Sequence, residues 1–306
     1  MKVKLFYTTG LNDIQEMVWD KPEPKDNEIE VQSVYTGICS SDVAMFDGTF
    51  TTLPKEIQGH ECIGKVTKVG LNVEANSPVK VGDYVATRGE PGFADYYNTP
   101  IENFVVIPKA EPKYIIEPVA CGINIARSVI DRGLNKSIAI IGTGFLARVI
   151  YEYLHYLGYN NFTVYGKAFK DYWESKKDVD YRQHRAFHLD VTGKDKFDYF
   201  IDLTSHPQYF NPAYVKTNGT FVIGAEKQVE NIDFSKFLWE NITIKCPSPR
   251  DEDFKECMKQ AVELIKTSKI KTKDLWGKEY HRDNALTAFT NRLNGVDKLR
   301  SYVSWQ

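Results

Sequence analysis

Two short segments carry side chains that are suited to hold a zinc ion. Cys39 lies in TGICSSD, and His60 and Glu61 lie in QGHEC. A thiolate and a neutral imidazole are good zinc ligands, and a catalytic zinc needs about three protein ligands with one position left open. The segment EPVAC offers two more candidates, Glu117 and Cys121. Taken singly, each of these residues is more often structural, because a cysteine packs as a small apolar side chain and a histidine or glutamate caps or pairs in a turn.

A glycine-rich turn follows further along the chain. The segment GTGFLA runs from Gly142 through Gly144, Phe145 and Leu146 to Ala147, and it fits the pattern G-x-G-x-x-A between an apolar run and a helical pattern. Glycine permits the tight turn, and it lets backbone N–H groups approach a pyrophosphate that then lies at the positive end of the helix. We therefore expect a dinucleotide site, the alternative being a tight turn that binds nothing.

The next apolar run, FTVYG, bears on which nucleotide is bound. A cofactor with a free ribose 2′-OH normally meets an Asp or Glu at the end of this second strand. Here Gly166 occupies that place, and Lys167 and Lys170 follow it. Without a carboxylate there is no repulsion of a 2′-phosphate, and two ammonium groups could pair with it. NADP(H) is therefore preferred over NAD(H), unless both lysines merely face solvent on a surface loop.

The elements that must position these residues fall into two patterns. Up to about residue 110 the chain reads as short extended runs separated by turn formers, which predicts an all-β unit with Cys39 in a turn after a strand. From about residue 117, apolar runs such as SIAIIG alternate with helical patterns such as FLARVIYEYLHYLGY. This alternation predicts a doubly wound parallel sheet, an α/β fold. After about residue 250, two amphipathic helices and a final strand-like run, RSYVSW, could return to the first domain.

Composition limits the classes of partner. The 39 basic and 41 acidic residues give a formal charge of −2, which offers no general attraction for nucleic acid or an anionic membrane. The N-terminal segment lacks the apolar core of a secretory signal, and no run is apolar enough to span a membrane. The five cysteines are scattered, which is unlike a disulfide framework. We expect a cytoplasmic protein that acts on a small molecule.

The order of these motifs resembles the zinc-containing medium-chain dehydrogenase/reductase superfamily, and alcohol, polyol and threonine dehydrogenases are most similar. The resemblance rests on TGICSSDVAMFDG, QGHECIGKVTKVG, VKVGDYVA, GFADYYNTPIENFVVIPK, EPVACGINIA, GTGFLA and TNGTFVIGA, in that order. It implies a GroES-like β-rich catalytic domain made of residues 1–123 and 250–306. It also implies a Rossmann dinucleotide-binding domain at 124–249, abbreviated in the segment before DYFID. A homodimer or homotetramer is implied as well.

The resemblance also implies roles for single residues. Cys39 and His60 match the first two zinc ligands, and Glu61 matches an acid beside the metal that can act as an exchangeable ligand. The third ligand is either Glu117, which matches the polyol group and is favoured, or Cys121, which matches classical alcohol dehydrogenases.

Ser41 matches the hydroxyl that takes the alcohol proton, and Asp42 matches a supporting acid. Gly142, Gly144 and Ala147 match the pyrophosphate turn.

Three departures from the family pattern shape the expected function. Only TRGEP stands where many members carry four cysteines, so one catalytic zinc and no structural zinc are expected. Ala44 stands where a proton-relaying histidine often lies, and the link before DYFID is short. We expect zinc-dependent hydride transfer between an alcohol, polyol or carbonyl substrate and NADP(H) or NAD(H). The alternatives are a zinc-free quinone or enone reductase, or a nucleotide-binding protein without activity.

Overall fold

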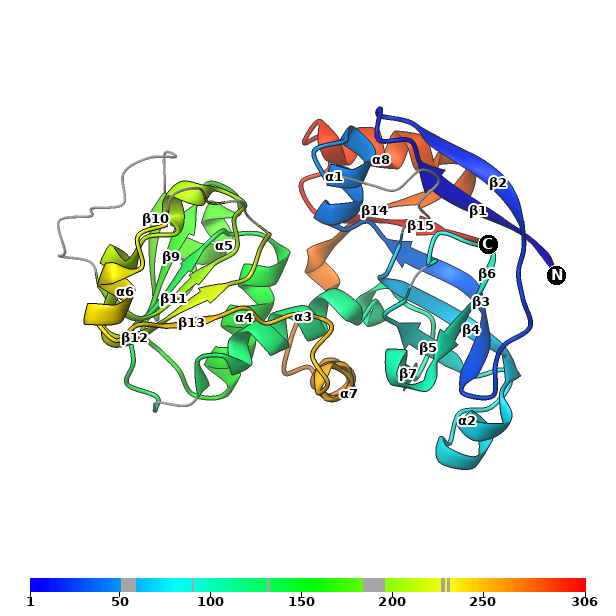
Figure 1. Cartoon of the computed structure of the whole chain (residues 1–306), viewed down its shortest axis with the longest axis horizontal. Helices are drawn as coiled ribbons and strands as arrows, with labels where there is room; N and C mark the ends of the chain where they lie inside the picture. The colour runs from blue at the N-terminus through cyan, green and yellow to red at the C-terminus, as the bar shows by residue number, and fades with distance from the viewer. Residues whose placement is uncertain (51–58, 90, 131–132, 184–195, 227–228, 230–231) are drawn as a thin grey trace. The chain divides into compact units, whose positions relative to one another are not determined.

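The computed structural model describes residues 1–50, 59–89, 91–130, 133–183, 196–226, 229 and 232–306. These residues form two compact units, one from Met1–Ala120 with Lys255–Gln306 and the other from Cys121–Phe254. Within the described ranges, no helix is long and apolar enough to cross a membrane. Figure 1 labels the helices and strands of both units.

The first unit is built on a seven-stranded sheet with the order β14-β15-β3-β4-β5-β7, in which β6 also pairs with β3. Its N-terminal part has this order: β1 (Lys2–Thr8), β2 (Ile14–Asp20), β3 (Glu28–Gly37), α1 (Ser40–Asp47), β4 (Cys62–Val69), α2 (Leu71–Asn76), β5 (Tyr84–Thr87), β6 (Tyr96–Pro100) and β7 (Phe104–Ile107). The hairpin β1–β2 forms a separate antiparallel sheet. The strands of this sheet pack on an apolar cluster that includes Ile29, Val31, Val85 and Tyr97.

The C-terminal segment completes this sheet. It contains α7 (Phe254–Lys266), β14 (Trp276–His281), α8 (Ala285–Leu293) and β15 (Arg300–Ser304). Strand β15 pairs antiparallel with β3, although the two strands are more than 260 residues apart in sequence. Helix α8 also holds α1 in place, because the rings of Phe46 and Phe289 pack with their centroids 5.5 Å apart. The start of α1 is thereby fixed beside β3 and β15.

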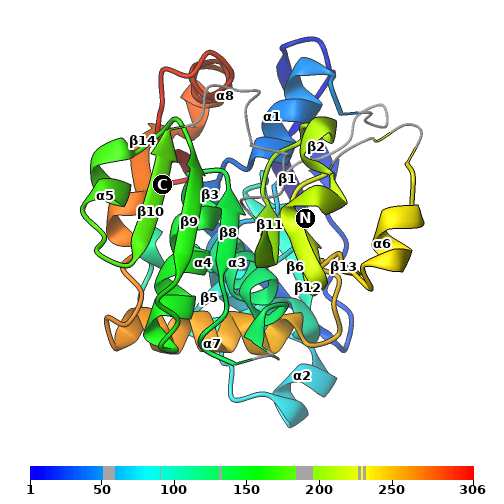
Figure 2. The ribbon, with the colours of Figure 1, turned by 90° about the vertical axis from the view of Figure 1, so that its left-hand side faces the viewer.

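The second unit is a six-stranded parallel sheet with the order β10-β9-β8-β11-β12-β13. Figure 2 shows β10, β9, β8 and β11 side by side in this order. The elements are α3 (Glu117–Arg127), which begins in the first unit, then β8 (Ile138–Ile141), α4 (Phe145–Tyr156), β9 (Phe162–Gly166), α5 (Lys170–Glu174), β10 (Val179–Gln183), β11 (Phe197–Asp202), β12 (Val215–Ile223), α6 (Ser235–Trp239) and β13 (Thr243–Lys245).

This strand order is that of a doubly wound dinucleotide-binding sheet, in which ligands bind beside the first strand where the order reverses. All four residues of β8 are buried, as a strand covered on both faces requires. The predicted α/β fold class is confirmed. The short link that we predicted before β11 falls mostly in residues 184–195, which lie outside the described residues.

Candidate active site and nucleotide site

Cys39 lies at the junction between β3 and α1. It is the N-cap residue of α1, with extended backbone angles, and its N–H donates a 2.9 Å hydrogen bond to the Asp42 carboxylate. An acidic side chain in the first turn satisfies a backbone donor at the helix end and favours helix initiation there. Gly48 ends the helix in the left-handed conformation, with φ +80°. The thiol is therefore presented at the start of a helix that is held at both ends.

His60 and Glu61 lie directly before β4, next to this helix start. His60 Nδ1 is 3.6 Å from Asp42 Oδ1, and Asp42 is only 1% exposed. One ligand atom each from Cys39, His60 and Glu61 lies within 4.8 Å of the other two. A thiolate, an imidazole and a carboxylate brought this close are suited to share one cation such as zinc.

Glu61 is fully buried, and its two carboxylate oxygens have different surroundings. Oε1 accepts a hydrogen bond from the buried Arg300 guanidinium on β15. Oε2 has no hydrogen-bond partner among the described residues. A buried carboxylate oxygen without a donor is costly, and a bound cation would remove that cost. Gly37 leaves room for this oxygen, since a Cβ at position 37 would overlap Oε2.

The charges of the site are strongly coupled. Burial, the largest influence, raises the pKa of Asp42 above its ordinary value. Burial alone would lower the pKa of His60, but the negative charges of Asp42, Cys39 and Glu117 raise it well above the ordinary value. Likewise, burial opposes the charged form of Arg300, yet Glu61, Cys39 and Glu117 raise its pKa overall. A site that gathers several negatively charged side chains in this way favours a positive charge at its centre.

Arg300 is a site residue that sequence reasoning missed. We predicted RSYVSW only as a strand, and all five residues of β15 are buried. An arginine inside a fully buried strand must be paired, because an isolated buried charge is very unfavourable. That signal was present in the sequence, but the partner on another strand could not be identified from it.

The two candidates for the third ligand lie in different units. Glu117 begins α3 in the first unit, is 3% exposed, and acts electrostatically on both His60 and Arg300. It is not part of the 4.8 Å group. Cys121, one turn later on α3, is the first residue of the second unit and is partly exposed. Ser41 lies in the first turn of α1 and is also partly exposed.

The glycine turn lies between β8 and α4, as its spacing predicts. Gly142 has φ +111°, a left-handed conformation that favours glycine, and its N–H donates to the Tyr165 carbonyl at 2.9 Å. Gly144 is the N-cap of α4, and Phe145, Leu146 and Ala147 form the first turn. A Cβ at Gly144 would meet no described atom within 4 Å. Glycine at this position therefore leaves space at a helix N-terminus, where an anion is favoured.

The residue at the end of β9 has a packing reason to be glycine. A Cβ at Gly166 would overlap the Thr143 side chain and would lie 2.7 Å from its Oγ1. Thr143 also accepts a 3.2 Å hydrogen bond from the Ala168 N–H at Oγ1. Lys167 follows on an exposed loop, and Lys170 begins α5, where it forms a 3.6 Å ion pair with Glu174 at the end of the same helix. The loop after β9 is therefore held close to the glycine turn.

Comparison with known proteins agrees with this architecture. Residues 25–109 match the alcohol dehydrogenase GroES-like domain. Alcohol dehydrogenase 2 of Emericella nidulans is 35% identical over 92 residues, which are 28% of this chain and 25% of that protein. The matched segments cover between 16% and 46% of the curated relatives' lengths, so this chain covers less than half of each.

Solved structures match over nearly the whole chain. A protein from Sinorhizobium meliloti 1021 solved with NADP bound has a TM-score of 0.79 at 17% identity, with 99% of each chain covered. Acetophenone reductase from Geotrichum candidum, solved with NAD, has a TM-score of 0.78 at 17% identity, with 99% of this chain and 97% of that chain covered. At these identities the likeness establishes the fold. Residues 25–109 thus belong to the alcohol dehydrogenase GroES-like domain family, and the chain as a whole has the fold of these dehydrogenase structures, which supports its resemblance to the medium-chain dehydrogenase/reductase superfamily.

Proposed function

We propose that this protein is a zinc-dependent alcohol or polyol dehydrogenase that transfers a hydride between a substrate carbon and NADP(H). The observation that carries the proposal is the group formed by Cys39, His60 and Glu61, with the buried Glu61 Oε2 lacking a hydrogen-bond partner among the described residues. The glycine turn of the second unit supplies the second requirement, a place for a dinucleotide.

Cys39 and His60 would hold the metal, with Glu61 as an exchangeable ligand and Glu117 favoured over Cys121 as the third ligand. A zinc ion held there acts as a Lewis acid toward an alcohol or carbonyl oxygen. The donor set fits a single catalytic zinc, and we propose no structural zinc.

The chain's own residues have three further roles in this proposal. Asp42 orients the His60 imidazole through their 3.6 Å contact. Arg300 fixes Glu61 by holding Oε1, so that Oε2 is directed away from this bond. Ser41 stands two residues after Cys39, in the first turn of α1. From there its hydroxyl accepts the proton from the alcohol or passes it on.

The preference for NADP(H) over NAD(H) rests on the end of β9. Gly166 places no carboxylate where a 2′-phosphate would lie, and an acidic side chain there would collide with Thr143. Lys167 and Lys170 could pair with the phosphate, since the surface ion pair between Lys170 and Glu174 is weak. Gly142, Gly144 and the first turn of α4 would bind the pyrophosphate.

We also propose that the protein forms a homodimer or homotetramer. The outer strand β13 pairs with β12 and is the last strand of its sheet. Next to it in sequence, Leu238 and Trp239 on α6 are 75% and 83% exposed. A strand edge that no other described strand pairs with, beside exposed apolar side chains, is a surface that proteins commonly cover.

Metal analysis followed by titration with NADPH and NADH tests the proposal. We expect about one zinc per chain, tighter binding of NADPH, and turnover with a panel of alcohols, polyols and aldehydes. Cys39→Ala and His60→Ala should abolish metal-dependent turnover and keep NADPH binding, while Cys246→Ala, an exposed cysteine, serves as the control.

The other outcomes identify the rival functions. NADPH binding without metal would identify a zinc-free reductase, and the absence of both would identify a protein without this activity. Unchanged turnover in the Cys39 or His60 variant would rule out the zinc mechanism.

A further inference from the structure

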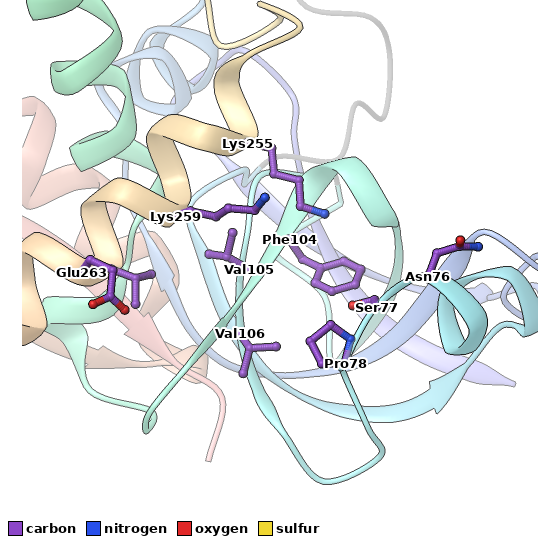
Figure 3. A pocket seen from close by; sticks show the side chains of 10 residues that line it. Asn76, Ser77, Pro78, Phe104, Val105, Val106, Lys255, Lys259 and Glu263 are labelled. Carbon is purple, nitrogen blue, oxygen red and sulfur yellow. The ribbon is translucent and has the colours of Figure 1, made fainter.

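A hollow lies in the first unit between α7, β7 and the end of α2, apart from the proposed zinc site (Figure 3). It encloses about 310 Å³, which is at the lower end of the range for small-molecule pockets. Phe104 and Val105 of β7 are buried and form its apolar wall. Asn76 and Ser77 line it from the end of α2, and none of the residues of the proposed zinc site takes part.

Lys255 extends from the start of α7 into this hollow. Its Nζ donates a hydrogen bond to the Ile101 carbonyl and lies 5.2 Å from the centroid of the Phe104 ring. An ammonium group can donate three hydrogen bonds, and among the described residues the Lys255 ammonium donates this one, to the Ile101 carbonyl. Burial lowers the pKa of Lys255, and the positive charge of Lys259 lowers it further, against weaker opposite effects of Glu102 and Glu256. The positive charge of Lys255 is therefore only partly balanced by the negative charges of Glu102 and Glu256.

Lys259 stands one turn later on the same face of α7, and Figure 3 shows both side chains extending from the side of the helix on which Phe104 and Val105 lie. Like charges at this spacing on a helix repel one another. Lys259 forms a 2.6 Å ion pair with Glu256, but both side chains are more than half exposed, so the pair contributes little. Glu263, the acidic residue of the lining, is engaged by Lys266 at 2.9 Å. An anion between the two lysines would relieve their repulsion.

We propose that this hollow binds a small organic carboxylate with a flat apolar body. The carboxylate would lie between the ammonium groups of Lys255 and Lys259, and the apolar body would pack on Phe104 and Val105. Two lysines supply charge-assisted hydrogen bonds, whereas the apolar wall supplies contact area that a simple inorganic anion would not use. The proposal does not depend on the dehydrogenase activity.

Calorimetric titration of the whole protein with 2-naphthoate tests this site. We expect saturable binding that is at least about tenfold weaker in Lys255→Met and in Lys259→Met. The matched control is Lys65→Met, which removes an exposed ammonium from β4 of the same unit and leaves the residues of the hollow and their ion pairs in place, and it should bind as the unaltered protein does. Thermal melting verifies that each variant is folded.

Two further probes separate charge from apolar contact. 2-Naphthamide has the same rings without the charge, and acetate has the charge without the rings, so both should bind at least about tenfold more weakly than 2-naphthoate. Equal binding of either probe would overturn the proposed ligand class. 2-Naphthoate binding that is absent, or that is unaffected by both Lys255→Met and Lys259→Met, would overturn the site itself.

Discussion

Glu61 shows how one buried side chain can be prepared for a cation. Arg300 neutralises the carboxylate through Oε1, which makes burial of the charge tolerable. The remaining oxygen, Oε2, faces a space that is kept open by the absence of a side chain at Gly37. The backbone also holds Gly37 and Glu61 together, because the Gly37 N–H donates a 2.8 Å hydrogen bond to the Glu61 carbonyl.

Gly37→Ala should therefore weaken zinc binding without removing any proposed ligand. A Cβ at this position overlaps Glu61 Oε2 and must displace the carboxylate. We expect zinc affinity to fall at least about tenfold, as losses of supporting contacts around metal sites do. Competition with a chromogenic chelator measures it.

Gly89→Ala provides the control for this change. Its Cβ would make one close contact, 3.2 Å from Thr99 Oγ1, away from the proposed ligands. Equal zinc affinities of the two variants would show that the position of Glu61 Oε2 does not matter for the metal.

At the scale of elements, the two glycines before α4 serve different purposes: Gly142 is required by the backbone conformation, and Gly144 by the proposed binding of the nucleotide. Gly142 has a left-handed backbone, whereas Gly144 has φ −81°, which other residues can adopt, and the space around its missing Cβ is open. We predict that Gly144→Ala leaves the free energy of unfolding unchanged or slightly increases it, because alanine reduces the entropy of the unfolded chain.

The same Gly144→Ala change should weaken NADPH binding at least about tenfold, since the added methyl group occupies the approach of the pyrophosphate. Denaturant unfolding without cofactor and fluorescence titration with NADPH measure the two effects. Unaltered NADPH affinity would contradict our assignment of the turn.

The pairing of β3 with β4 encloses a second buried charge. Glu30 on β3 accepts a 2.9 Å hydrogen bond from Thr67 on β4, and it forms a 2.7 Å ion pair with the fully buried Lys21. Burial alone would raise the pKa of Glu30, but the hydrogen bonds from Lys21 and Thr67 lower it overall. Loss of the Glu30 charge would leave the buried Lys21 ammonium without its ion-pair partner, and breaking a buried pair in this way typically costs about 3–5 kcal/mol.

A lowered pKa in the folded state makes stability depend on pH. Glu30 contributes stability above the pKa of the unfolded chain, and this contribution is lost as pH falls through the lower pKa of the folded state. We expect Glu30→Gln to be destabilised at neutral pH, with the difference from the unaltered protein shrinking under acid conditions.

Denaturant unfolding at a series of pH values measures this difference, and Glu74→Gln, at an exposed position of α2, is the control. A difference that stays constant down to acid pH would show that Glu30 is not ionised in the folded protein.

For the whole molecule, local patterns predicted the second unit better than the first. SIAIIG, GTGFLA and FTVYG lie next to one another along the chain, so a buried strand, a glycine turn and a helix could be read from them directly. Helix α1 was missed because TGICSSD was predicted as a turn, and its apolar residues lack helical spacing. That helix is stabilised by packing of Phe46 on Phe289, a contact between distant segments.

The candidate site divides in the same way. Cys39, His60 and Glu61 could be selected from residue types and motif order, because the chemistry of a ligand is visible in its identity. Arg300 could not be selected, because its role arises from the antiparallel pairing of β15 with β3 and not from any neighbour in sequence. The proposed ligand hollow at Lys255 likewise joins segments that are far apart along the chain.

The last prediction concerns how the two units respond to their ligands. Each unit has its own apolar clusters, one group around Val31 and Phe46 and another around Phe200 and Phe221. A ligand that binds only the folded state protects the segments it stabilises from opening. In hydrogen exchange, zinc should protect residues 34–47 and 59–69, and NADPH should protect 138–174.

Two variants give this experiment opposite controls. In Cys39→Ala, zinc should no longer protect its segments from exchange, whereas NADPH should still protect 138–174. In Gly144→Ala, the protection by NADPH should be lost and that by zinc kept, because Cys39 and Gly144 belong to different units. Loss of both effects in Cys39→Ala would mean that the zinc site also controls the nucleotide site. In that case the metal would act on cofactor binding as well as on the substrate oxygen, and the two sites could no longer be assigned separate roles.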